Sequence, residues 1–191
     1  AIGVSIGFLL VFSSLLITTM QLRNLLEETR QAEISIQATH DQLTGLPNRI
    51  LFHDRLAQAL ARAERRESIF SVLYLDLDNF KYVNDEYSHD DGDRTLRIIA
   101  ERIQNCIRNS DTAGRISGDE FLVLLENIEN SENAAVISQK ILNAISRPIT
   151  GKDQEIMVTA SIGITIFPED GKTNGELIQN ADIAMYYAKS V

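Results

Sequence analysis

The stretch Arg115-Ile116-Ser117-Gly118-Asp119-Glu120-Phe121 places a short polar turn between two apolar segments. The segment before the turn runs from Thr112 to Ile116, and the segment after it is Phe121-Leu122-Val123-Leu124-Leu125. Two apolar runs joined by a tight, glycine-containing turn are typical of a β-hairpin. We therefore expect the carboxylates of Asp119 and Glu120 at the hairpin tip, clear of the sheet, where they can meet a cation.

A second acidic point lies upstream of this hairpin. The run Ile69-Phe70-Ser71-Val72-Leu73-Tyr74-Leu75 has the near-continuous apolar character of a strand buried on both faces, and it ends in Asp76-Leu77-Asp78. An unpaired ionised Asp at the end of such a strand would cost several kcal/mol or shift its pKa. We therefore expect Asp76 and Asp119 to share a hard, oxygen-preferring ion such as Mg²⁺. A simple strand-end turn at Asp76 and Asp78 fits these residues equally well.

Composition limits the classes of partner. The 191 residues include 18 Lys and Arg against 27 Asp and Glu, which gives a formal net charge of −9. Nucleic acids are bound by surplus Lys and Arg, so this balance argues against a nucleic-acid partner. Cys106 is the only cysteine, which excludes a disulfide within the chain.

The amino-terminal part differs from the rest of the chain. Residues 1–21, AIGVSIGFLLVFSSLLITTMQ, carry no charge and reach the ~20 residues of a transmembrane helix. The absence of an initiator Met and of a basic leader fits a fragment of a longer protein. Arg23 and Arg30 follow the apolar segment, which favours a cytoplasmic location for what comes next.

Residues 22–40 carry a weak heptad pattern, at Leu22, Leu25, Thr29, Ala32, Ile36 and Thr39. This pattern predicts either a signalling stalk that holds two copies together or a solvated linker helix.

The remainder alternates between helical and extended patterns. Apolar stripes predict helices around residues 52–63, 96–106, 134–145 and 177–188, and a period of two from Ile156 to Ile166 predicts one long strand. The fold class is therefore α/β or α+β, with a mixed or antiparallel sheet packed by helices.

The two acidic motifs together resemble a known family. Ser117-Gly118-Asp119-Glu120-Phe121, with Asp76-Leu77-Asp78-Asn79-Phe80-Lys81-Tyr82-Val83-Asn84-Asp85 upstream, is similar to the signature of the GGDEF family, the diguanylate cyclases. The resemblance implies that residues 41–191 form an α+β domain with a five-stranded, ferredoxin-like sheet, similar to a polymerase palm and surrounded by helices. It also implies that a homodimer condenses two GTP into cyclic di-GMP and releases two pyrophosphates.

The resemblance also assigns roles to individual residues. Asp76, Asp119 and the backbone carbonyl of Leu77 would hold two Mg²⁺ or Mn²⁺ ions in each half-site, and Glu120 would help the attacking hydroxyl lose its proton or stand beside the metal. The substrate-binding residues implied in the same way are Asn84 and Asp93 for guanine, Lys81 and Lys189 for phosphates, the amides around Asn79 and Phe80, and Gly118 in the signature turn.

A regulatory site is implied as well. Arg108-Asn109-Ser110-Asp111 resembles the inhibitory R-x-x-D site of the family, which binds the product, cyclic di-GMP. The Arg side chain suits forked recognition of phosphate or guanine edges. Arg115 is expected to add a third contact there.

Three features depart from the family pattern. Ser117 stands where the first Gly of the signature would be, so we expect its side chain to crowd the nucleotide or alter the turn. Ser88 replaces another usual Gly, and the Arg expected beyond Lys189 lies past Val191. A different function therefore stays open, that of a silent module that binds GTP or cyclic di-GMP and regulates a partner or a downstream phosphodiesterase domain. In either case the resemblance implies the bacterial inner membrane, with the catalytic domain in the cytoplasm.

Overall fold

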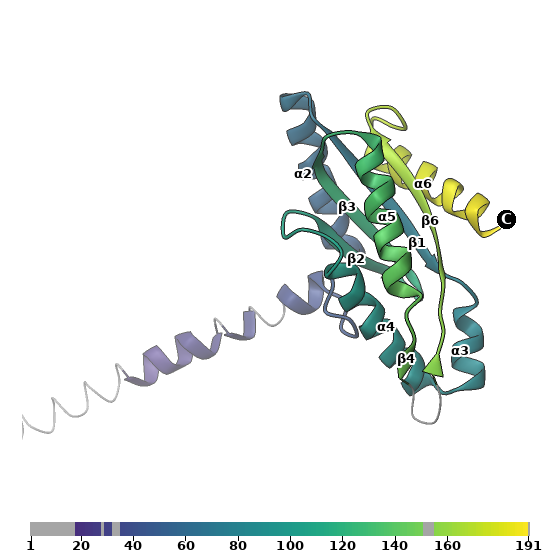
Figure 1. Cartoon of the computed structure of the whole chain (residues 1–191). Coiled ribbons are helices and arrows are strands. Elements are labelled where there is room, and N and C mark those ends of the chain that lie inside the picture. The colour runs from purple at the N-terminus through teal and green to yellow at the C-terminus, as the bar shows by residue number, and fades with distance from the viewer. Residues whose placement is uncertain (1–17, 28, 32–34, 151–154, 191) are drawn as a thin grey trace, which may run out of the picture. The chain divides into compact units, whose positions relative to one another are not determined.

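The structure, a computed structural model, describes residues 18–27, 29–31, 35–150 and 155–190 (Figure 1). The chain divides into two units, Ala1–Ala38 and Thr39–Val191. The described part of the first unit is helical, and the side chains of Leu22, Leu25 and Ile36 are exposed. Most of the predicted transmembrane segment, residues 1–17, lies outside the described residues. No helix in the described part is long and apolar enough to span a membrane.

The second unit is built on a four-stranded sheet. Its strands are β1 (Ile69–Leu77), β2 (Thr112–Ser117), β3 (Glu120–Ile128) and β6 (Ala160–Phe167). They lie in the order β2-β3-β1-β6, and each neighbouring pair is antiparallel. Two short strands, β4 (Ile149–Thr150) and β5 (Glu155–Ile156), form a separate ribbon. The α+β class is confirmed, whereas the prediction of a five-stranded sheet is wrong for the described residues.

The long strand predicted over Ile156 to Ile166 is also wrong. Ile156 pairs with Ile149 in the ribbon, residues 157–159 belong to no strand, and pairing with β1 begins at Ala160. Alternation of apolar residues indicates which face a side chain takes, but it does not indicate the strand that its backbone pairs with. The chain therefore leaves one sheet and enters another without a break in the pattern.

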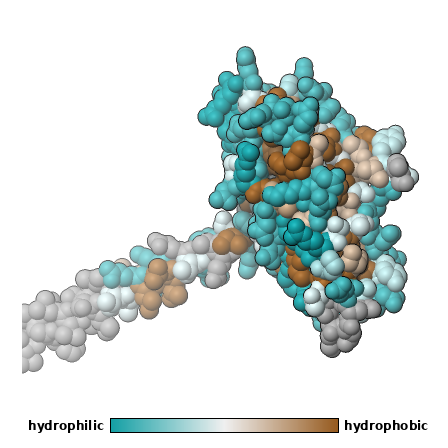
Figure 2. Space-filling view, viewed as in Figure 1, coloured by the Kyte–Doolittle hydropathy of each residue, from teal (hydrophilic) through white to brown (hydrophobic). Residues whose placement is uncertain are grey.

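Helices cover both faces of the central sheet (Figure 1). Helices α2 (Arg49–Arg66) and α6 (Asn174–Lys189) pack on one face, and α4 (His89–Gln104) and α5 (Ser131–Ile145) pack on the other. Strand β1 is buried on both sides, as predicted. Phe70, Val72 and Tyr74 pack in the apolar cluster with α2 and α6, and Leu73, Leu75 and Leu77 pack in the cluster with α4 and α5. In the space-filling view, hydrophilic residues cover much of the visible surface of this unit (Figure 2).

Two helices begin at side-chain caps. Asn48 Oδ1 accepts hydrogen bonds from the amides of Ile50 and Leu51 at 3.0 and 3.2 Å at the start of α2. Ser88 Oγ accepts from the amide of Asp91 at 3.1 Å at the start of α4. A Ser is a favourable residue at such a position, so the Gly that the family pattern has there is not needed for this helix to begin.

Gly163 in β6 gives the first prediction, because it lies against the backbone of α6. An added Cβ would lie 1.9 Å from the carbonyl oxygen of Ala181 and 2.3 Å from the nitrogen of Met185. We expect Gly163→Ala to lower the free energy of unfolding by about 3 kcal/mol, measured by urea denaturation. The matched control is Gly175→Ala in α6, where a Cβ meets nothing within 4 Å. An unchanged denaturation midpoint in Gly163→Ala would contradict this packing.

Candidate functional site

The predicted hairpin is present, but Glu120 is the first residue of a strand and does not lie in the turn. Strand β2 ends at Ser117 and β3 begins at Glu120, so the turn consists of Gly118 and Asp119. Gly118 has φ +41°, in the region that favours glycine. Among the described residues other than glycine, positive φ occurs only at Glu67, Asn79 and Asn127, so Ser117 fits its strand without backbone strain. The expectation that its side chain would crowd the nucleotide or alter the turn stays a prediction.

The pairing of β1 with β3 gathers the acidic residues at one end of the sheet. Asp76 lies directly opposite Glu120, and the amide of Leu77 donates to the carbonyl of Asp119 at 3.3 Å. Lys189, at the end of α6, forms an ion pair with the Asp76 carboxylate. The structure thus brings together Asp76, Leu77, Asp119 and Glu120, and it adds Lys189, for which the resemblance implied a phosphate contact.

This end of the sheet has an excess of negative charge. Burial raises the pKa of Asp119, and the neighbouring charges of Asp76 and Glu120 raise it further. Burial opposes the charge of Lys189, but its hydrogen bond and charge interaction with Asp76 outweigh that effect and raise the pKa of the ammonium. One lysine close to three carboxylates leaves the cluster under-neutralised, so an added cation would be stabilised there.

The donor set at this end of the sheet fits a hard ion that also binds a substrate. In the described part of the chain, no group of three or more His, Cys, Asp or Glu is placed to hold a metal by itself. Mg²⁺ commonly takes only one or two carboxylates and completes its shell with water and phosphate oxygens. Asp76 and Asp119 are suited to that incomplete kind of site.

Asp78 has a structural role, unlike Asp76. Its carboxylate accepts hydrogen bonds from Thr159 Oγ1 at 2.7 Å and from Ser161 Oγ at 2.9 Å. These bonds fasten the end of β1 to the start of β6. Of the two interpretations that the sequence left open, the strand-end turn therefore describes Asp78, whereas Asp76 lies in the charged cluster.

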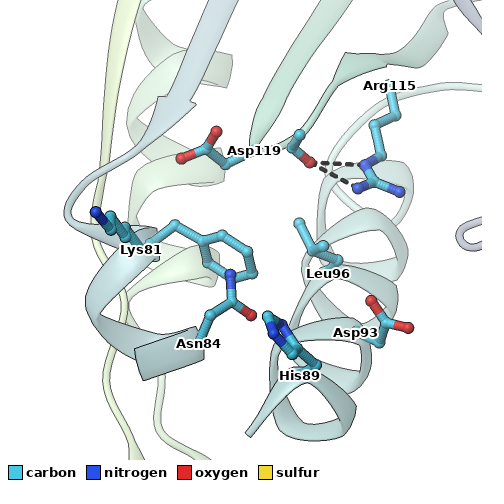
Figure 3. Close-up of a pocket in the computed structure, with 9 residues that line it drawn as sticks. Lys81, Asn84, His89, Asp93, Leu96, Arg115 and Asp119 are labelled. Carbon is cyan, nitrogen blue, oxygen red and sulfur yellow. Dashed lines mark hydrogen bonds between the residues drawn. The ribbon is translucent and has the colours of Figure 1, made fainter. Parts of the chain in front are cut away.

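A cavity of about 340 Å³ opens beside the hairpin (Figure 3). Its lining residues are Phe80, Lys81, Asn84, His89, Asp93, Leu96, Arg115, Gly118 and Asp119. Six of these were predicted as substrate or metal residues, and they come from the short helix α3 (Phe80–Glu86), from α4 and from the hairpin. Figure 3 shows Asn84 and Asp93 on the opposite side of the cavity from Asp119.

Sequence reasoning missed several residues of this cavity. His89 and Leu96 lie on the same face of α4 as Asp93, at spacings of four and three residues, which was the signal available for finding them. Gly92 was missed as well. A Cβ at Gly92 would lie 2.0 Å from Asn84 Oδ1, so this glycine makes room for the Asn84 amide.

Arg115 lies at the cavity and connects two segments. Its Nη1 donates to both carboxylate oxygens of Asp41 at 3.0 and 3.2 Å. Its Nε and Nη2 donate to the carbonyl of Gly118 at 2.9 and 2.7 Å, the two dashed bonds of Figure 3. Burial opposes the charge of Asp41, but hydrogen bonds from Thr44 and Arg115 lower the pKa of its carboxyl overall. The structure therefore places Arg115 at the hairpin, in a different cavity from those that Arg108 and Asp111 line, and its third contact to a ligand at that site stays a prediction.

Arg108 and Asp111 lie next to each other on another part of the surface. The buried Asp111 carboxylate accepts from the backbone amides of Arg108 at 3.0 Å and Glu126 at 3.2 Å. The Arg108 residue is exposed and lines a cavity of about 300 Å³ with Arg55. Asp111 therefore holds the turn before β2, while the Arg108 guanidinium is the more accessible of the two groups.

The fold and the site together define a structural class of domain. The class is an α+β domain with a ferredoxin-like strand order, an acidic hairpin and a polar cavity beside it. The family described as "Diguanylate cyclase, GGDEF domain" matches residues 38–191, and the chain belongs to this GGDEF family.

Similar proteins include several from Pseudomonas aeruginosa. The bifunctional diguanylate cyclase/cyclic di-GMP phosphodiesterase MucR is 49% identical over 152 residues, which are 80% of this chain and 22% of MucR. The diguanylate cyclase TpbB is 40% identical over 163 residues, which are 85% of this chain and 38% of TpbB. The chain thus spans between about a fifth and two fifths of the length of these relatives.

Solved structures agree with the fold. The GGDEF domain of TpbB is 40% identical, with a TM-score of 0.77 and coverage of 79% of this chain and 88% of that one. The coiled coil and GGDEF domain of DgcB from Caulobacter crescentus, in complex with c-di-GMP, is 28% identical with a TM-score of 0.80 and covers 94% of each chain.

The charged cluster gives the second prediction. In chelator-treated protein we expect Asp119→Asn to raise the free energy of unfolding by up to about 1 kcal/mol, because it removes a carboxylate whose pKa the fold raises. The gain should shrink as the pH falls through the carboxyl range, since the folded wild type then binds a proton at Asp119 and loses both the cost of burying the charge and the repulsion.

The control for this prediction is Asp78→Asn. That change weakens the bonds from Thr159 and Ser161 and should lower the free energy of unfolding by about 1 kcal/mol. Denaturant titrations at several pH values measure both variants. A loss of stability in Asp119→Asn would contradict the electrostatic account.

Proposed function

We propose that this domain is a diguanylate cyclase, which condenses two GTP into cyclic di-GMP and releases two pyrophosphates. One observation supports the proposal most strongly. A single cavity is lined by an amide, a carboxylate and a lysine, from Asn84, Asp93 and Lys81, and it ends at Asp119 in the acidic cluster. Base, phosphate and metal groups of one nucleotide could be bound along such a cavity.

The far end of the cavity suits guanine. The Asn84 amide can donate to the acceptor edge of the base, while the Asp93 carboxylate can accept from its N1 and N2 donors. Adenine has no donors at the corresponding positions, so this pair would select GTP over ATP. Lys81 and Lys189 would bind phosphate oxygens, and the amides around Asn79 and Phe80 would bind the terminal phosphates. Asn79 has φ +54°, a backbone conformation that often contributes to anion-binding turns.

Asp76, Asp119 and the carbonyl of Leu77 would hold Mg²⁺ or Mn²⁺, with two ions in each half-site. When bound, the ions would neutralise the charge of the phosphates and of the leaving pyrophosphate. Glu120 would accept the proton of the attacking 3′-hydroxyl, whose oxygen then bonds to the α-phosphorus of the other GTP as the bond to pyrophosphate breaks.

One cavity accommodates one GTP, so the reaction requires a homodimer in which two cavities face each other. The helical residues before Thr39 are the proposed means of holding two copies together. Membrane attachment through residues 1–21, with the domain on the cytoplasmic side of a bacterial inner membrane, stays a prediction.

A second candidate is a silent module that binds GTP or cyclic di-GMP and regulates a phosphodiesterase. Two relatives favour keeping it. MucR is named as bifunctional, and NbdA from Pseudomonas aeruginosa, 38% identical over 168 residues, is named a cyclic di-GMP phosphodiesterase. The retained Asp76, Asp119, Glu120 and Lys81 favour the cyclase.

The third prediction tests the proposed reaction. Purified protein given GTP and Mg²⁺ should release pyrophosphate and form cyclic di-GMP, measured by chromatography. Asp119→Ala should lower the turnover at least a hundredfold while the circular dichroism spectrum stays unchanged. The control is Glu64→Ala, which removes an exposed carboxylate of α2 that lines neither the cavity beside Asp119 nor the one beside Glu120, and it should keep wild-type turnover within a few-fold. GTP binding by dimers that form no product would favour the silent module.

The fourth prediction concerns Arg108. Because its backbone amide, and not its side chain, holds Asp111, Arg108→Ala should spare the turn. We expect this variant to raise the cyclic di-GMP concentration for half-inhibition at least tenfold while the uninhibited rate is unchanged. Arg97→Ala, at another exposed arginine, serves as the control. Unaltered inhibition in Arg108→Ala would remove the regulatory role.

A further inference from the structure

Ser117 and Glu120 face each other across the hairpin. They are directly paired residues of β2 and β3, so their side chains lie on the same face of the sheet. Ser117 Oγ donates a hydrogen bond to Glu120 Oε2. The residue that departs from the family signature therefore contacts one of the acidic residues that follow it.

Glu120 has a very different neighbour on its other side. Asp76 is directly opposite it on β1, and two carboxylates in such a pair repel each other. The ion pair with Lys189 neutralises Asp76 only in part, because the ammonium is also close to Asp78 and Asp119. A donor on the β2 side therefore favours the rotamer of Glu120 that is directed away from Asp76.

The hairpin separates Glu120 from Asp119. Asp119 lines the cavity shared with Asn84, whereas Glu120 lines a second cavity of about 360 Å³ between α2, α6 and the hairpin. Ser117 and Tyr74 line this second cavity too. Burial and the adjacent charge of Glu120 raise the pKa of the Tyr74 phenol, so the Tyr74 hydroxyl stays protonated beside the carboxylate.

We propose that Ser117 is a positioning residue, whose hydroxyl holds the Glu120 carboxylate on the β2 side, away from the metal ligand Asp76. Held there, Glu120 serves the attacking hydroxyl and does not become a further ligand of the ion. This role rests on the proposed cyclase function. A glycine at position 117 has no hydroxyl, so the Glu120 carboxylate would keep its hydrogen bond with Tyr74 but lose the donor on the β2 side.

Steady-state kinetics test the catalytic part of this proposal. We expect Ser117→Ala and Ser117→Gly to lower kcat by about fivefold to tenfold, with the KM for GTP and the Mg²⁺ dependence unchanged within twofold. Ser117→Thr keeps the hydroxyl and should restore most of kcat. In a Glu120→Gln background, Ser117→Ala should have no further effect, because the group through which it acts has gone. Equal losses of kcat on Ser117→Ala in the wild-type and Glu120→Gln backgrounds would overturn the proposal, and so would an unchanged kcat in the wild-type background.

A second measurement tests the contact without any turnover. A double-mutant cycle of Ser117→Ala and Glu120→Gln, by urea unfolding of metal-free protein, should show coupling of about threefold to tenfold in the unfolding equilibrium constant. Ser146→Ala, whose exposed hydroxyl bonds to the Asn143 carbonyl, should show no coupling with Glu120→Gln. Absent coupling for Ser117 would overturn the contact. If the wild type had no turnover, the cyclase function would fail while this cycle still decided the Ser117 contact.

Discussion

The pairing of β1 with β3 is the constraint on which the site depends. Its register sets Asp76 opposite Glu120 and brings the amide of Leu77 to the carbonyl of Asp119. Buried side chains on both faces fix that register, because a slip by one residue would turn every core residue to the wrong side. Apolar packing along the sheet thus maintains a cluster of like charges at its end, and burial together with this repulsion raises the pKa of Asp119.

The hairpin also connects parts of the domain that lie far apart in sequence. Arg115 joins Asp41, near the start of the second unit, to the carbonyl of Gly118 in the turn. On opposite sides of the tip, Asp119 and Glu120 line two different cavities. Adjacent acidic residues of one signature are thereby given separate surroundings, which suits separate roles for an ion ligand and a proton acceptor.

Local patterns were sufficient to predict the elements that surround the site. The hairpin and the buried strand before Asp76 each follow from a few neighbouring residues. Of the six predicted residues that share the first cavity, Asp119 follows from the hairpin pattern, and the other five were found through the resemblance to a family, since single lysines or carboxylates on a surface carry no such information.

The remaining features depend on residues distant in sequence. Asp78 accepts hydrogen bonds from Thr159 and Ser161, and Asp41 accepts from Arg115. These partners are too distant in sequence for a local pattern to predict them. The break between β5 and β6 could not be predicted because apolar and polar residues continue to alternate through it. The contact of Ser117 with Glu120 required the register of the hairpin, which includes a shift between Arg115 and Ser117.

Anomalous diffraction from crystals grown with Mn²⁺ and a non-reactive GTP analogue would test the central claim most directly. The account predicts a manganese peak within coordination distance of the Asp76 and Asp119 carboxylates, with guanine between Asn84 and Asp93. The Glu120 carboxylate should lie outside the coordination shell and remain bonded to Ser117. Nucleotide bound without a peak at Asp76 and Asp119, or with Glu120 as a ligand in place of Asp119, would contradict it.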